Sequence, residues 1–288
     1  RYVAFASEAT NLDPTDSNDR FDIFLHDRES GTTNLVSIEP DGTQHRIHSI
    51  EPSMSDDGTL IAYATWKDPE VPYFGGALSG VFTGWAYDVP AETTIRLADF
   101  SFAEGVCVAD YGPQVSPDGS VAVAECGPKG AFLYRQNSRE IVPLPVSGGF
   151  MMPTGSDRVF FADQDQENST SWDLFVFDIE SEAVSTLADV NATWTLDNLS
   201  ISADGRYLSA VKSDEMGGFN DWFIVDTSAG NTSSLTLEYG LTHPGGPGST
   251  RLDLSGDGKY GAFSSTLGDL VDNDTNETGD IFVIQLLD

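Results

Sequence analysis

The chain has 288 residues, of which 46 are Asp or Glu and 14 are Lys or Arg, so its formal net charge at pH 7 is −32. This charge repels phosphate backbones and anionic lipid surfaces, which argues against nucleic acid as a partner. No apolar run approaches the roughly 20 residues that span a bilayer, so we expect no membrane insertion.

A short motif, Ser-x-Asp-Gly followed by an apolar run, recurs along the chain. In chain order the motif occurs at 55–58, 116–119, 202–205 and 255–258. A degenerate copy occurs at 155–157, and residues 1–5 form an apolar run without the turn before it. Asp-Gly between two short apolar runs predicts a tight hairpin, because Gly accepts the positive φ of the turn. Each copy therefore predicts the two inner strands of a β-sheet.

A second apolar element follows each hairpin and predicts a third strand, at 22–25, 84–87, 130–133, 173–176, 221–224 and 280–283. In most copies a polar turn and a short run then supply a fourth strand. Four-stranded units at spacings of roughly 40 to 60 residues, without helical periodicity, are typical of propeller blades. We therefore predict an all-β, six-bladed β-propeller of four-stranded antiparallel blades, as a single domain over 1–288. The first and last blades are incomplete, because the first copy lacks an innermost strand and the last lacks an outermost one.

The residues that carry this pattern are Ser-x-Asp-Gly, then Tyr-x-Ala-Phe, then Asp-Ile-Phe-x-x-Asp. They resemble the TolB-like PD40 family of WD40-like β-propeller repeats over nearly the entire chain, most closely over 1–58. The resemblance implies the propeller fold. It implies no single function, because such repeats serve in scaffolds, protease gates and carbohydrate-active enzymes.

Loops between the second and third strands of a blade, and connections between blades, emerge on one face of such a propeller. Two of these loops share the spacing Asp-x-Asn-x-x-x-Asp, and their oxygen-bearing residues are Asp16, Asn18 and Asp22 in the first and Asp272, Asp274, Asn276 and Asp280 in the last. Ca²⁺ prefers six to eight oxygen ligands, so we predict calcium-ordered loops. The alternative is that these residues only shape the loops through Asx turns.

Three histidines lie in connections that reach the same face, namely His45, His48 and His243, with Arg46 between the first two. If the protein is an enzyme, these four residues are the candidates for catalysis. A metal site built on His45 and His48 lacks a third His or Cys. The sequence also lacks the common hydrolase signatures, which argues against the common hydrolases but says little about a lyase.

Several aromatic residues fall in the predicted loops and are candidates for ligand binding: Trp66, Tyr73, Phe74, Trp194 and Phe219. Exposed aromatic rings can stack on sugars or anchor a peptide. The alternative is that they fold inward and cover the ends of the blades.

Cys107 and Cys126 are the only cysteines. The hairpin about 116–119 pairs residues whose numbers sum to about 235, which places Cys126 opposite residue 109, two positions from Cys107. We therefore predict a disulfide, which favours an oxidising compartment and hence an extracellular, periplasmic or cell-surface location.

The leading hypothesis is a secreted or cell-surface, non-catalytic propeller that binds a protein or a glycan through its loop-bearing face. The first alternative is a carbohydrate-active enzyme, a polysaccharide lyase or a glycoside hydrolase, with its site at the axial opening. The second is a structural module of a longer repeat protein or assembly, because the sequence begins in the middle of a repeat.

Overall fold

The computed structural model describes residues 1–66, 82–97, 112–125, 130–146, 151–155, 157–164, 172–192, 195–213, 220–234, 252–265, 270–271 and 278–286. These residues form strands β1 to β22 and no α-helix. The described residues thus contain no helix that is long and apolar enough to cross a membrane.

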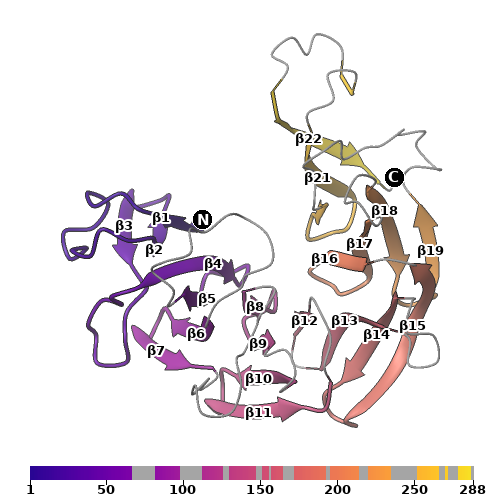
Figure 1. The fold of residues 1–288 in the computed structure, drawn as a ribbon, viewed down its shortest axis with the longest axis horizontal. Helices are drawn as coiled ribbons and strands as arrows, with labels where there is room; N and C mark the ends of the chain where they lie inside the picture. The colour runs from indigo at the N-terminus through magenta and orange to yellow at the C-terminus, as the bar shows by residue number, and fades with distance from the viewer. Residues whose placement is uncertain are drawn as a thin grey trace. The chain divides into compact units, whose positions relative to one another are not determined.

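The strands form six antiparallel sheets, which are the six blades of a β-propeller (Figure 1). The first sheet has the order β1 (Tyr2–Ser7), β2 (Asp22–Asp27), β3 (Thr32–Leu35). The second has the order β4 (His48–Met54), β5 (Leu60–Trp66), β6 (Phe82–Asp88), β7 (Thr93–Arg96). The third has the order β8 (Gln114–Val115), β9 (Val121–Glu125), β10 (Ala131–Arg135), β11 (Glu140–Leu144).

The remaining three sheets repeat the arrangement. The fourth has the order β12 (Met151–Thr154), β13 (Arg158–Gln164), β14 (Trp172–Asp178), β15 (Ala183–Ala192). The fifth has the order β16 (Thr195–Ile201), β17 (Tyr207–Ser213), β18 (Asn220–Asp226), β19 (Asn231–Ser234). The sixth has the order β20 (Asp253–Leu254), β21 (Tyr260–Ser265), β22 (Asp280–Gln285). The prediction of incomplete first and last blades is therefore confirmed, since only these two sheets have three strands among the described residues.

The chain divides into two compact units, residues 1–157 and residues 158–288. The first unit holds strands β1 to β12 and the second holds β13 to β22. That the whole chain is one domain stays a prediction.

The Ser-x-Asp-Gly motif builds the same hydrogen-bonded turn in several blades. In the second sheet the Ser55 hydroxyl donates to Asp57 Oδ1 at 2.8 Å and accepts the Leu60 N–H at 3.1 Å, while Asp57 Oδ1 accepts the Thr59 N–H at 3.0 Å. Gly58 closes the turn with φ 73°, a left-handed conformation that favours Gly. Equivalent bonds occur at Ser116, Ser202 and Ser255. The motif is therefore a turn-forming device, as its composition predicts.

The hydrophobic core lies between the faces of successive sheets within each unit. Ile23 and Leu25 of β2 pack with Tyr63 and Trp85 of the second sheet. In the second unit, Trp222 of β18 packs with the last sheet at a ring distance of 4.6 Å from Phe263. Such burial of large apolar side chains is the main stabilising contribution to the sheets.

Neighbouring sheets are also joined by polar contacts near the turns. The Asp56 N–H donates to the Pro117 carbonyl at 2.8 Å in the first unit, and the Ala203 N–H donates to the Gly256 carbonyl at 2.9 Å in the second. These are equivalent positions of the motif. The turns therefore fix the spacing of successive blades as well as their own hairpins.

The register of the third hairpin differs from the one we expected. Val115 pairs with Ala122, so the paired numbers sum to 237 rather than about 235. Continuing this register would move the partner position of Cys126 from 109 to 111, further from Cys107. Both cysteines lie outside the described residues, and the disulfide stays a prediction.

Candidate functional site

Two connecting segments of the first unit meet at one end of the first sheet. Residues 8–21 join β1 to β2, and residues 36–47 join β3 to β4. The registers Ser7↔Asp22 and Phe24↔Leu35 place both segments beyond the same ends of these strands. We call residues 8–21 and 36–47 the loop pair, and the opposite end, which carries the Ser-x-Asp-Gly turns, the turn side.

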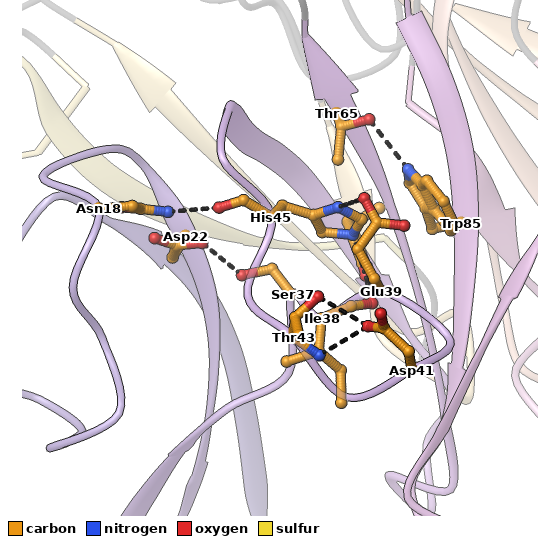
Figure 2. Close-up of polar contacts among 11 residues, drawn as sticks. Asn18, Asp22, Ser37, Ile38, Glu39, Asp41, Thr43, His45, Thr65 and Trp85 are labelled. Atoms are coloured by element: carbon orange, nitrogen blue, oxygen red, sulfur yellow. Dashed lines mark hydrogen bonds and ion pairs between the residues drawn. The ribbon is translucent and has the colours of Figure 1, made fainter.

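The two segments of the loop pair are joined by hydrogen bonds. Asn18 Nδ2 donates to the His45 carbonyl at 2.7 Å (Figure 2). The Ser17 N–H donates to Gln44 Oε1 at 3.0 Å, and the Ser49 N–H, at the start of β4, donates to the Phe21 carbonyl at 2.7 Å. The loop pair is thus one hydrogen-bonded body.

The first predicted calcium loop surrounds an amide group. Gln44 Nε2 donates to Asp16 Oδ1 at 2.8 Å and to Asp22 Oδ2 at 2.9 Å, so the amide lies between the two carboxylates. Asn18 Oδ1 accepts the Arg20 N–H at 2.8 Å as an Asx turn. Most of these oxygens therefore accept protein hydrogen bonds, but Asp16 Oδ2 is buried and has no hydrogen-bond partner among the described residues.

Asp22 is fully buried at the start of β2. Its Oδ1 accepts the Ser37 hydroxyl at 2.7 Å (Figure 2). Burial raises the pKa of Asp22 to about 6, because the charged form is poorly solvated there. Hydrogen bonds from Ser37, Asn18 and Gln44 oppose this rise, and the neighbouring Asp16 carboxylate adds to it.

His45 is 1% exposed, and both of its ring nitrogens have partners. Nδ1 lies 2.9 Å from Glu39 Oε1 and Nε2 lies 3.1 Å from the Tyr63 hydroxyl (Figure 2 shows the contact with Glu39). The ring also lies 4.7 Å from the ring of Trp85, whose Nε1 donates to Thr65. Burial lowers the pKa of His45, and the Glu39 carboxylate opposes this. His45 therefore fastens residues 36–47 to the second sheet.

His48 has a different set of contacts at the start of β4. Its Nδ1 accepts the Phe21 N–H at 3.1 Å, and its ring centroid lies 5.8 Å from that of Phe21 and 5.7 Å from that of Trp66. Arg20 Nη1 lies 3.5 Å from Nε2. Burial and Arg20 lower the pKa of His48, while Glu8 opposes them. His48 therefore fastens residues 8–21 to β4.

Among the described residues, the structure does not bring the three placed catalytic candidates, His45, Arg46 and His48, together into one group. His45 and His48 belong to separate hydrogen-bond networks, and Arg46 between them is exposed. Trp66, a candidate for ligand stacking, is only 7% exposed and packs with Ile50. This aromatic residue folds inward, which is the alternative that the sequence left open.

Other predicted site residues can be placed only in part. Asp280 is the first residue of β22, opposite Ser265. Ten predicted residues lie outside the described part of the chain: Tyr73, Phe74, Cys107, Cys126, Trp194, Phe219, His243, Asp272, Asp274 and Asn276. Within the described part, no group of three or more His, Cys, Asp or Glu side chains is arranged to hold a metal ion.

Sequence reasoning missed the residues that engage the histidines and the acids. Gln44 carried no signal, because amides are common in loops. Glu39 could have been found, because Pro40-Asp41-Gly42 is a turn signal that folds the chain back from Glu39 toward His45. The Glu39 N–H donates to the Thr43 carbonyl at 2.7 Å across this turn.

Comparisons with known proteins support the fold alone. No family model and no curated protein matches the chain. Among solved structures, the chain is similar to TolB from Acinetobacter baumannii, with 16% identity, a TM-score of 0.58 and coverage of 99% of this chain and 61% of that one. The chain thus spans about three fifths of the length of that TolB chain.

Two other similar structures come from enzymes. The β-propeller domain of the Trilobed protease from Pyrococcus furiosus is 13% identical, with a TM-score of 0.59 and coverage of 99% of this chain and 78% of that one. An oligogalacturonate lyase from Vibrio parahaemolyticus is 12% identical, with a TM-score of 0.59 and coverage of 94% of this chain and 75% of that one. At these identities the likeness shows a shared architecture and no shared activity. The chain has a TolB-like six-bladed β-propeller fold.

Proposed function

We propose that this chain is a non-catalytic β-propeller of the PD40 repeat type that binds a protein or a glycan through the face formed by the loop pair. The observation that carries the proposal is the engagement of both described histidine candidates in internal contacts. His45 has both ring nitrogens bonded and a buried ring, and His48 accepts a main-chain N–H. A general base needs a nitrogen that can reach a substrate, and neither ring offers one readily.

The exposed groups of the loop pair fit a recognition surface. Arg46 is exposed in the connection 36–47, and most of residues 8–12 are exposed in the other segment. A rigid, hydrogen-bonded base under exposed side chains lowers the entropy that a binding surface loses on association. The net charge of −32 favours a neutral or basic partner over an acidic one. The proposed location is extracellular, periplasmic or cell-surface.

Two charge reversals, one at each end of strands β2 and β3, test whether the ligand binds on the face formed by the loop pair. Arg46→Glu alters the loop pair, and Arg28→Glu makes the same charge change on the turn side, where Arg28 is also exposed. Ligands of the wild-type chain are first identified on a glycan array and in a displayed-peptide library, and their affinities are then measured. We expect Arg46→Glu to change the affinity about tenfold, with a loss where the ligand contacts the guanidinium and a gain where a basic ligand is repelled by it, and Arg28→Glu to change the affinity less than about twofold. Equal effects of the two variants, or a wild-type chain that binds neither class, would contradict the proposal.

Calcium binding by the first loop is a separate part of the proposal. The buried Asp16 Oδ2 without a hydrogen-bond partner supports it, and the Gln44 amide between the carboxylates opposes it. A cation bound only by the native state must raise the melting temperature. Calcium should raise the melting temperature of the wild type and not that of Asp16→Asn. If calcium leaves the melting temperature of the wild type unchanged, the first loop binds no calcium and the Gln44 amide alone lies between the two carboxylates.

The enzyme alternative keeps one point of support, the likeness to an oligogalacturonate lyase. It requires that the wild-type chain cleave a polysaccharide. The structural-module alternative requires that the chain bind other repeats of a longer protein rather than a separate ligand. The binding experiment distinguishes the structural-module alternative from the proposed function. A turnover assay distinguishes the enzyme alternative from the proposed function.

A further inference from the structure

The hydrogen bonds of the two described histidines assign opposite tautomers to them. Glu39 carboxylate oxygens only accept, so neutral His45 must carry its proton on Nδ1, which leaves Nε2 to accept the Tyr63 hydroxyl. The Phe21 N–H only donates and lies 3.1 Å from Nδ1 of His48, whereas Arg20 Nη1, which also only donates, lies 3.5 Å from Nε2. The shorter contact assigns the bare nitrogen of neutral His48 to Nδ1 and its proton to Nε2, so that Arg20 has no acceptor on this ring. The two rings, three residues apart, therefore respond differently to a second proton.

His45 can take up a proton without losing a contact. Protonated His45 would donate from Nδ1 to Glu39 and from Nε2 to the Tyr63 oxygen. The Tyr63 hydroxyl hydrogen would then turn to the Ile38 carbonyl, which already lies 3.3 Å away. No polar group loses its hydrogen-bond partner when His45 is protonated. The connection 36–47 therefore keeps its attachment to the second sheet.

His48 cannot take up a proton in the same way. A proton on Nδ1 would face the Phe21 N–H, and the hydrogen bond between them would be lost because both groups would be donors. The charged ring would also lie beside the Arg20 guanidinium, with Nη1 3.5 Å from Nε2. Among the described residues, Glu8 is the charged group that favours the protonated ring, whereas the neighbouring rings of Phe21 and Trp66 carry no charge.

We infer that protonation of His48 weakens the attachment of residues 8–21 to β4, while His45 keeps residues 36–47 in place, so that the loop pair is an acid-operated switch. Phe21 loses one of its two hydrogen bonds to β4 and keeps the other, since its carbonyl still accepts the Ser49 N–H. The burial and the positive neighbour that lower the pKa of His48 place the switch below the ordinary range of histidine. Its consequence for ligand binding rests on the proposed function, whereas the switch itself needs no ligand.

Amide hydrogen exchange of Phe21 in the 288-residue chain tests the switch. Its protection factor, corrected for the intrinsic pH dependence of exchange, is measured from about pH 7.5 down to about pH 4, well below the ordinary pKa of histidine. We expect protection to fall about tenfold in acid, the effect of losing one hydrogen bond. His48→Asn places a non-titrating acceptor near the position of Nδ1, so its protection should stay constant. His45→Gln is the matched control and should lose protection as the wild type does.

Unchanged protection in the wild type, or an equal loss in His48→Asn, would overturn the inference. If His48→Asn does not fold, the ring nitrogen shifts of the wild type decide. At neutral pH we expect the proton on Nε2 of His48 and on Nδ1 of His45, and a proton on Nδ1 of His48 would overturn the inference. Neither measurement uses a ligand, so a failed switch leaves the outcome of Arg46→Glu standing, and a failed binding test leaves the switch standing.

Discussion

Asp57 on the turn side and Asp22 beside the loop pair are in opposite electrostatic states. Asp57 lies on the turn side and is exposed. Slight desolvation raises the pKa of Asp57, but hydrogen bonds from Thr59 and Ser55 lower it by more, so the pKa falls below its ordinary value. Asp22, at the start of β2 next to the loop pair, is buried, and its pKa rises to about 6 despite three hydrogen-bonding partners. The turn chemistry recurs in four blades, whereas the Asp22 network joins the side chains of the first sheet to the two connecting segments beside it. The turn side therefore serves stability, and the loop pair carries the features that are specific to this chain.

The largest effect should come from breaking a turn. Ser55→Ala removes the acceptor of the buried Leu60 N–H and a donor to Asp57. Leaving a buried N–H unsatisfied should lower the free energy of unfolding by about 2 to 3 kcal/mol, measured by urea denaturation. Ser30→Ala, an exposed serine in the turn between β2 and β3, is the control and should cost about 0.5 kcal/mol or less. Similar costs for both variants would break the assignment of the motif to stability.

The opposite pKa shifts of Asp22 and Asp57 should give opposite pH dependences. The pKa of Asp22 is higher in the folded state than in the unfolded chain, so the folded state binds an extra proton between about pH 4 and about pH 6. Ionisation of Asp22 should therefore lower the free energy of unfolding by about 2 kcal/mol as the pH rises through this window. The contribution of Asp57 has the opposite sign, because it is present above the ordinary pKa of Asp and lost as the pH falls.

Carboxyl carbon shifts of labelled aspartates measure these titrations directly. We expect a midpoint of about 6 for Asp22 and a midpoint below the ordinary value for Asp57. A normal midpoint for Asp22 would mean that water reaches its carboxyl group. The difference between the two regions would then be one of hydrogen bonding alone.

The smallest effect should come from backbone strain on the turn side. The turn between the third and fourth strands of a blade has a left-handed residue, which is Gly31 or Gly230 in two blades and Glu92, Arg139 or Glu182 in three others. Glu182, with φ 55°, is exposed, so Glu182→Gly should relieve strain and raise the free energy of unfolding by about 0.5 kcal/mol. Gly230→Ala is the reverse control and should lower it. A loss of stability in Glu182→Gly would show that its side chain contributes more than its backbone costs.

The sequence predicted the turn side well, because its contacts are local. Ser55, Asp57 and Leu60 are within one turn of each other, so their spacing alone specifies the hydrogen bonds. The third strands could be predicted from the Asp-Ile-Phe pattern, because this pattern is also local in the sequence. The loop pair could be predicted only in part. Its position followed from the order of strands, but Gln44 reaches Asp16 and Asp22 from more than 20 residues away, and no spacing rule predicts such a contact.

The most direct test of the account is the role of His45 in the wild-type chain and in His45→Gln. The proposed function predicts that the wild type releases no unsaturated product from oligogalacturonate or from a panel of other polysaccharides. It also predicts that His45→Gln lowers the free energy of unfolding by about 2 kcal/mol through loss of the contacts with Glu39 and Tyr63. Turnover by the wild type that His45→Gln abolishes while remaining folded would contradict the account, since it would make His45 a catalytic residue.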